Sequence, residues 1–195
     1  YNNSEISVGH PALSPDGKRL FFVSDMPGGY GGSDIYMCKD LGGQWGEPEN
    51  LGSSINTPQN EVFPFIGADA AIYFSSNGHP GLGGLDIFSA SYLGLDEYAA
   101  PVNVGAPVNG MQDDFAFIID AAKKKGYFSS NRHGGQGDDD VYAFEMLAPL
   151  EQRFLCTGLV IDDDNGSPLI DLEVKLLDKD GVLLGTTRTD ARGEY

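Results

Sequence analysis

One segment of this sequence occurs three times, and this repetition constrains the fold more than any other feature. Its copies align without gaps over residues 19–37, 71–89 and 125–143 and read RLFFVSDMPGGYGGSDIYM, AIYFSSNGHPGLGGLDIFS and KGYFSSNRHGGQGDDDVYA. A second block, ENLGSSINT over residues 49–57, is repeated as VNVGAPVNG over residues 102–110. Repeats of roughly 40–50 residues are typical of propellers and other repeat architectures.

Each repeat unit predicts four short antiparallel strands. An apolar first strand is followed by a tight turn, which is clearest at residues 14–17, where Ser-Pro-Asp-Gly has the residues that such turns favour. Next come the aromatic strand, a glycine-rich loop of eight residues, and a strand that begins with Asp. The fourth strand is expected near residues 45–51 and 98–104, and the third unit has no match for it.

The sequence therefore predicts an all-β fold, a partial β-propeller of three four-stranded blades over residues 1–148. The blades are expected near residues 8–60, 61–112 and 113–148. Because propellers close with about 4–8 blades, we expect further blades before residue 1. The apolar positions expected to pack between neighbouring blades are Phe22, Phe74, Phe128, Ile35, Ile87 and Val141.

Residues 149–195 predict a linker followed by the start of a small β-sandwich. Val174 and Leu176 alternate with Lys175, and turn residues occur at 164–166 and 179–181. A complete sandwich of this type has about 100 residues, so we expect this part to be truncated.

Charge and composition exclude several classes of protein. The formal net charge is −17, and a nucleic-acid surface needs clustered Lys and Arg, so we expect no nucleic-acid partner. No apolar run approaches about 18 residues, so no transmembrane segment is expected. The 27 glycines in 195 residues are about twice the usual ~7 %, which indicates many tight turns. The sequence begins at Tyr1 without a leader, and we expect it to be a piece of a longer protein.

The repeated loop positions allow a metal-binding or a structural interpretation. These positions are Asp25, Asn77, Asn131, Asp34, Asp86, Asp140, Gly29, Gly81 and Gly135. Three carboxylates could converge on a propeller axis, but an Asp that follows a turn can instead accept backbone N–H bonds. Repetition in every blade favours the structural role, and the glycines are expected to supply positive φ angles. The loops lack a phosphate-binding motif and the three histidines lack a catalytic partner motif, so we expect no catalytic residue, no cofactor and no metal.

Residues 8–144 resemble the WD40-like, TolB-type propeller repeat, in the form found in OmpA-family envelope proteins of Bacteroidetes. The residues that carry the resemblance are HPALSPDGKRLFFVSDMPGGYGGSDIY and WGEPENLGSSINTPQNEVFPFI, with GYFSSNRHGGQGDDDVYAF as the closing repeat. TGLVIDDDNGSPLIDLEVKLLDKDG and TTRTDARGEY are similar to the first half of a carboxypeptidase-regulatory-like domain. By architecture the chain is also similar to the PorE-type component of type IX secretion. The resemblance implies a periplasmic, outer-membrane-associated protein that contacts peptidoglycan only through a domain absent from this sequence.

Our functional hypothesis is a non-catalytic scaffold that docks other envelope proteins, with a role in type IX secretion implied by the resemblance. Tyr30, Leu82 and Gln136 occupy one shared position in the three loops. The glycines around this position are the same in all three loops, while the residue at the position varies, as expected of a docking surface. These three residues are therefore the docking candidates. The alternatives are a propeller that binds a glycan or small ligand, and a propeller-based hydrolase.

Overall fold

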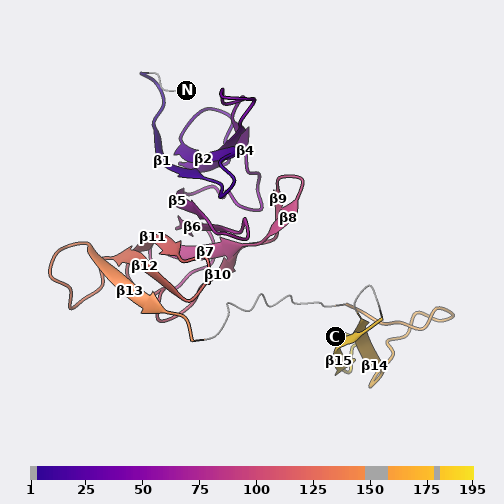
Figure 1. Ribbon diagram of the computed structural model, residues 1–195. Coiled ribbons are helices and arrows are strands. Elements are labelled where there is room, and N and C mark those ends of the chain that lie inside the picture. Colours follow the sequence, from indigo (N-terminus) through magenta and orange to yellow (C-terminus); the bar gives the residue numbers. More distant parts are fainter. Residues whose placement is uncertain (1–3, 148–157, 178–180) are drawn as a thin grey trace. The chain divides into compact units, whose positions relative to one another are not determined.

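The computed structural model describes residues 4–147, 158–177 and 181–195 (Figure 1). Contacts divide the chain into two units, Tyr1–Leu150 and Glu151–Tyr195. Most of the predicted linker lies outside the described residues. None of the described residues belongs to a helix long and apolar enough to cross a membrane.

The first unit consists of three antiparallel sheets, which we call the first, second and third blades (Figure 1). The first blade has the order β1 (Val8–Leu13), β2 (Arg19–Ser24), β3 (Asp34–Lys39) and β4 (Glu49–Asn50). The second has the order β5 (Glu61–Ile66), β6 (Ile72–Ser76), β7 (Asp86–Ala90) and β10 (Val102–Asn103). The third has the order β11 (Asp114–Ile119), β12 (Lys125–Ser130) and β13 (Asp140–Glu145).

The all-β prediction is confirmed, with one correction to the blades. Two blades have four strands, whereas the third has three among the described residues. The fourth strands are also shorter than expected, at two residues each. A hairpin of β8 (Tyr92–Gly94) and β9 (Glu97–Tyr98) takes up part of the range predicted for the second blade's fourth strand.

An equivalent aromatic pair joins the two central strands of every blade. Phe22 pairs with Tyr36, Phe74 with Phe88 and Phe128 with Tyr142 in the strand registers. The ring centroids of these pairs lie 6.0, 5.9 and 5.7 Å apart, with the rings stacked. Cross-strand aromatic pairs stabilise a sheet, and their recurrence explains why the aromatic positions of the repeat stay in register.

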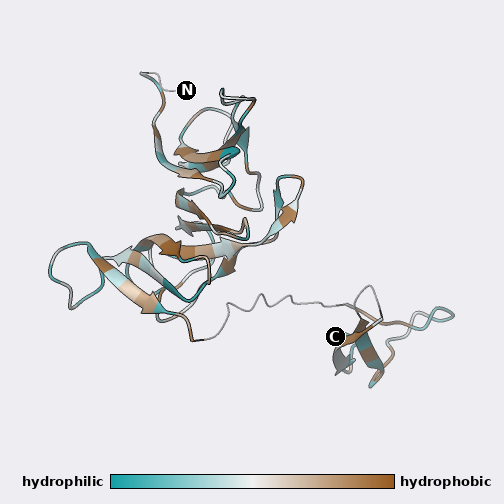
Figure 2. Cartoon of the chain, in the orientation of Figure 1, coloured by the Kyte–Doolittle hydropathy of each residue, from teal (hydrophilic) through white to brown (hydrophobic). Residues whose placement is uncertain are grey.

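Two apolar clusters fill the spaces between neighbouring blades, and the apolar residues of the strands are visible in Figure 2. Phe74 and Ile35 lie between the first and second blades, and both are 0 % exposed. Phe128 and Ile87 lie between the second and third blades and are also buried. These four residues are placed as predicted, because each sheet presents alternate residues to the blades on its two sides.

The prediction was wrong for the remaining two positions. Val141 is 73 % exposed, because the described residues contain no blade beyond the third. Phe22 is buried in a separate cluster with Tyr36 and Cys38 on the outer face of the first blade. Among the described residues, no apolar cluster joins the first blade to the third. The three blades therefore form an open row rather than a closed ring.

The first strand of every blade contains the same irregularity. The pairing register shifts within β1, β5 and β11, and the residues at the shift are His10, Phe63 and Ala116, with φ angles of 49°, 53° and 53°. Such angles are uncommon for residues with a Cβ, and a bulge bends the strand that carries it. These three strands lie beside one another, β5 between β1 and β11.

The second unit is small. Its strands β14 (Glu173–Leu177) and β15 (Leu183–Arg188) form an antiparallel hairpin. Isolated bridges join Leu159 to Glu194 and Ile161 to Pro168. The described part of this unit is all-β, and its assignment as the start of a β-sandwich stays a prediction.

Candidate interaction surface

The three glycine-rich loops are held by the aspartate that begins the following strand. The Asp34 carboxylate accepts the backbone N–H groups of Tyr30 at 2.5 Å and Gly31 at 3.2 Å. The other loops repeat the arrangement with Asp86, which accepts from Leu82 and Gly83, and Asp140, which accepts from Gln136 and Gly137. Each carboxylate thus binds the backbone of its own loop, which is the turn-fixing role described above.

The loop glycines are required for a reason that differs from our expectation. Gly29, Gly81 and Gly135 do not have positive φ angles. A Cβ atom at any of them would overlap the carboxylate of Asp34, Asp86 or Asp140, respectively. The close approach of the loop to the carboxylate therefore selects glycine, and the expectation of positive φ at these positions was wrong.

A second set of repeated side chains fastens the start of each loop. Asp25 Oδ1 accepts the N–H of Ser7 at 2.6 Å. Asn77 and Asn131 accept from Asn60 and Asp113 at 3.0 and 2.8 Å. In every blade the donor is the residue immediately before the first strand. The loop is therefore tied to the first strand at one end and to the third strand at the other.

The three docking candidates lie at exposed tips of these loops. The exposed fractions of Tyr30 and Leu82 are 50 % and 55 %, and Gln136 is also exposed. The backbone N–H of each is bonded to the aspartate of its loop. The frame is therefore fixed through the backbone, while the side chain at the tip is left open to solvent.

Two buried asparagines have a structural role that sequence analysis did not assign. Asn56 Oδ1 accepts the Ile35 N–H at 2.8 Å, and its Nδ2 donates to the Ile35 carbonyl at 3.0 Å. Asn109 makes the same two bonds to Ile87, at 2.9 and 2.8 Å. We call this two-bond arrangement the asparagine clamp. The weaker repeated block, ENLGSSINT and VNVGAPVNG, carried the signal for it.

Buried carboxylates at the start of the first strands are satisfied in different ways. Glu61 is 0 % exposed, and it accepts from the N–H and hydroxyl of Thr57 and from the Ser76 hydroxyl. Asp114 is also 0 % exposed, and it forms an ion pair with Arg132 at 2.5 Å. The Arg132 guanidinium lies over the rings of the third blade's aromatic pair. Both carboxylates are therefore fully engaged in holding the blades together.

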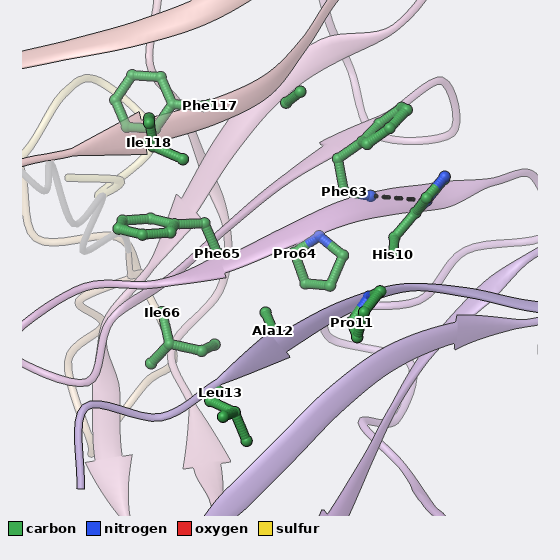
Figure 3. A pocket seen from close by; sticks show the side chains of 11 residues that line it. His10, Pro11, Ala12, Leu13, Phe63, Pro64, Phe65, Ile66, Phe117 and Ile118 are labelled. Atoms are coloured by element: carbon green, nitrogen blue, oxygen red, sulfur yellow. Dashed lines mark hydrogen bonds between the residues drawn. The ribbon is translucent and has the colours of Figure 1, made fainter. Parts of the chain in front are cut away.

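The bulged first strands line a shallow apolar groove of about 360 Å³ (Figure 3). His10 stacks on Phe63 with the ring centroids 4.0 Å apart, and its Nδ1 accepts the Phe63 N–H at 3.3 Å. Burial lowers the pKa of His10 below its ordinary value. His10 is the one titratable side chain in the lining, which otherwise consists of apolar residues of β1, β5 and β11.

The described part of the chain contains no group of three or more His, Cys, Asp or Glu side chains placed to hold a metal ion. In particular, Asp34, Asp86 and Asp140 belong to three separate loops, and each binds its own loop backbone.

Comparison with known proteins gives similarity at the level of structure. No family model matches the chain, and no curated protein matches it significantly. TolB from Acinetobacter baumannii is similar with 17% identity and a TM-score of 0.49, over 70% of this chain and 29% of that one. A puromycin-hydrolyzing peptidase from Mycobacterium tuberculosis is similar with 16% identity and a TM-score of 0.47, over 90% of this chain and 27% of that one. The chain spans less than a third of either protein.

Proposed function

We propose that this chain is a non-catalytic protein-docking module of a cell-envelope scaffold. The scaffold would act in the periplasm, in association with the outer membrane, and would contact peptidoglycan through a domain outside this sequence. A role in type IX secretion is the specific assignment that the sequence resemblance favours. The partners would be other envelope proteins.

The observation that carries this proposal is the construction of the three loops. Each has a backbone fixed by an aspartate, and each presents a different exposed side chain at the same position: Tyr30, Leu82 or Gln136. A fixed frame reduces the conformational entropy lost on binding, and variation at the tip supplies specificity. With a net charge of −17, association with a basic partner would weaken as the salt concentration rises.

Capture from an envelope extract tests the proposal. The immobilised wild-type chain is compared with the triple variant Tyr30→Ser, Leu82→Ser, Gln136→Ser, and the captured proteins are identified by mass spectrometry. We expect the triple variant to lose the proteins that the wild type captures, while the melting temperature stays unchanged.

A matched control uses exposed leucines in other connections. Leu41 and Leu95 are 73 % and 95 % exposed, and the variant Leu41→Ser, Leu95→Ser should capture the same proteins as the wild type. If the triple loop variant also captures them, the docking surface lies elsewhere on the molecule.

The groove in Figure 3 gives a second candidate, a site for a small apolar ligand. Its volume of about 360 Å³ is within the usual range of ligand sites, ~300–1,000 Å³. The hydrolase alternative has less support, since an acid–base pair needs two titratable groups and the lining supplies only His10. Thermal-shift measurement with a panel of apolar ligands, on the wild type and on Phe63→Ala, tests the ligand site.

A further inference from the structure

The outer edges of the first two blades are closed in the same way. β4 pairs with β3, and β10 pairs with β7. The carbonyls of Ile35 and Ile87 each accept a backbone N–H from the residue that follows the fourth strand, at 3.1 Å in both blades. The asparagine clamp then binds both polar groups of the same residue, Ile35 or Ile87.

In the third blade, the described residues include the equivalent edge strand, β13, but no segment that closes this edge. Val141 is the equivalent of Ile35 and Ile87, because it pairs with Ser129 as they pair with Val23 and Ser75. Among residues 4–147, no strand pairs with the outer side of β13. The Val141 side chain is 73 % exposed, whereas those of Ile35 and Ile87 are 0 % exposed. An unpaired edge of this kind is a template for an added strand.

The closing segment has a defined sequence pattern, Asn-apolar-Gly-x-x-apolar-Asn. The side-chain oxygen of the first Asn accepts a hydrogen bond from the side-chain Nδ2 of the second, at 2.8 Å in both blades. The glycine has a φ of 82° at Gly52 and 75° at Gly105, where residues with a Cβ are disfavoured. The apolar residue before the second Asn, Ile55 or Val108, packs in the cluster between the blades.

Within residues 1–195, no third segment carries that pattern. The spacing Asn-x-Gly-x-x-x-Asn occurs at residues 50–56 and 103–109, and both copies are engaged in their own blades. After Phe144 the sequence contains a single asparagine, Asn165, and the clamp requires two.

We propose that the outer edge of β13 is a strand-addition site for a partner polypeptide that carries the pattern Asn-apolar-Gly-x-x-apolar-Asn. The partner pairs with Tyr142 and Ala143 as β4 and β10 pair with their neighbours. It clamps the Val141 backbone with its second asparagine and covers the Val141 side chain with its apolar residue. Main-chain pairing at an open edge supplies affinity, and the side chains supply specificity. This site is separate from the loop tips and does not depend on the function proposed for them.

A peptide with the sequence of residues 47–58, EPENLGSSINTP, is the probe. Binding of the fluorescently labelled peptide to the full chain is measured by anisotropy, beside a control peptide in which the residues corresponding to Asn50 and Asn56 are alanine. We expect saturable binding of the first peptide, weakened roughly tenfold or more in the control, because the clamp's loss leaves backbone groups unpaired. Equal binding of the two peptides, or no binding of either, overturns the proposal.

Two measurements locate the site on the protein. The variant Val141→Pro removes the N–H that the clamp binds, at an edge position where proline is tolerated, and should abolish binding. Val141→Ala keeps the backbone and should weaken binding less. Hydrogen exchange on the wild-type chain gives the same information without a variant, since the peptide should protect the Val141 amide. If that amide is not protected, or if a folded Val141→Pro binds as the wild type does, the site is not at β13.

Discussion

Asn56 binds both backbone polar groups of Ile35, a residue 21 positions earlier in the chain, and Asn109 repeats this relationship with Ile87. The Asn56 side chain thereby binds the N–H of Ile35 and shares the carbonyl of Ile35 with the backbone N–H of Leu51. Asn56 is 1 % exposed and Ile35 is 0 % exposed, so water cannot satisfy the groups if the amide is removed.

Replacement of Asn56 by alanine should therefore destabilise the first blade strongly. A buried polar group left unsatisfied costs about 1–3 kcal/mol. The variant leaves the Ile35 N–H without its partner, while the Ile35 carbonyl keeps the N–H of Leu51. We expect Asn56→Ala and Asn109→Ala to lower the free energy of unfolding by roughly 1–3 kcal/mol each. Urea denaturation measures the change. Gln44→Ala, at an exposed position, is the control and should change stability by less than about 0.5 kcal/mol.

The equivalent glycines Gly83 and Gly137 should respond differently to alanine. A Cβ at Gly83 would overlap the carbonyl of Gln112, which belongs to the connection into the next blade. At Gly137 the described residues include no following blade, and the nearest described atom to a Cβ would be 3.6 Å away, an ordinary contact. Gly83→Ala should cost roughly 1–3 kcal/mol, while Gly137→Ala should be close to neutral. Similar thermal shifts for the two variants would contradict this account of the loops.

Phe74 should be among the most sensitive positions of the chain. Its side chain is 0 % exposed between the first and second blades, and truncation of a buried Phe to Ala costs about 3–5 kcal/mol. Val141→Ala on the open face of the third blade should change stability by less than about 0.5 kcal/mol. Chemical denaturation of both variants provides the comparison, and a loss below about 1 kcal/mol for Phe74→Ala would show that the blades do not pack through this residue.

Stability should fall on acidification through the titration of His10. Burial lowers the pKa of His10 in the folded chain, so the unfolded state takes up a proton at a higher pH than the folded state does. The contribution of neutral His10 to folding stability is therefore complete above its ordinary pKa of 6.5. This contribution is lost as the pH falls through the lower pKa of His10 in the folded chain. Protonation also removes the Nδ1 acceptor of the Phe63 N–H.

Melting curves of the wild type and His10→Phe between pH 7.5 and pH 5.5 test this dependence. The variant keeps a ring over Phe63 but cannot titrate. The melting temperature of the wild type should fall more than that of the variant over this interval. Parallel curves would assign the acid sensitivity of this interval to other groups.

The ion pair of Asp69 and Lys123 should contribute only between the titrations of its two members. Burial is the largest single effect on the pKa of Asp69 and would raise it, but the hydrogen bond and charge of Lys123 together with backbone N–H bonds outweigh burial, so the net shift of this pKa is downward. Burial is also the largest single effect on the pKa of Lys123 and would lower it, but Asp69 and Tyr73 together outweigh burial, so the net shift of this pKa is upward. The stability that ionised Asp69 contributes is lost as the pH falls through its folded-state pKa, which lies below 3.8. The stability that protonated Lys123 contributes is lost as the pH rises through its folded-state pKa, which lies above 10.5.

At pH 7 both members of this pair are charged, but their side chains are 42 % and 46 % exposed. Lys123→Met should therefore lower stability by no more than about 1 kcal/mol, and 1 M salt should reduce the difference from the wild type. A difference of several kcal/mol would show that the pair is far less accessible to solvent than these exposures imply.

The repeat, the strand order within each blade and the polar residues that hold the loops could all be predicted from the residues alone. This was possible because a propeller blade is a local structure: its strands are consecutive, its turns are short, and the alternation of side chains along a strand is visible in the residues. The equivalence of Phe22, Phe74 and Phe128 followed from the repeat, whereas the register that pairs each of them with an aromatic residue of the next strand came from the structure.

Which faces of the blades are buried, and why certain residues are required, became clear only from the packing of the blades. Val141 has the same sequence context as Ile35 and Ile87, yet it is exposed because burial depends on whether a neighbouring blade is present. The loop glycines are needed because carboxylates approach them from the next strand, and Asn56 is needed because a distant backbone group lacks a partner. Contacts between residues far apart in the chain leave no local pattern, so these requirements emerge only when the blades are packed together.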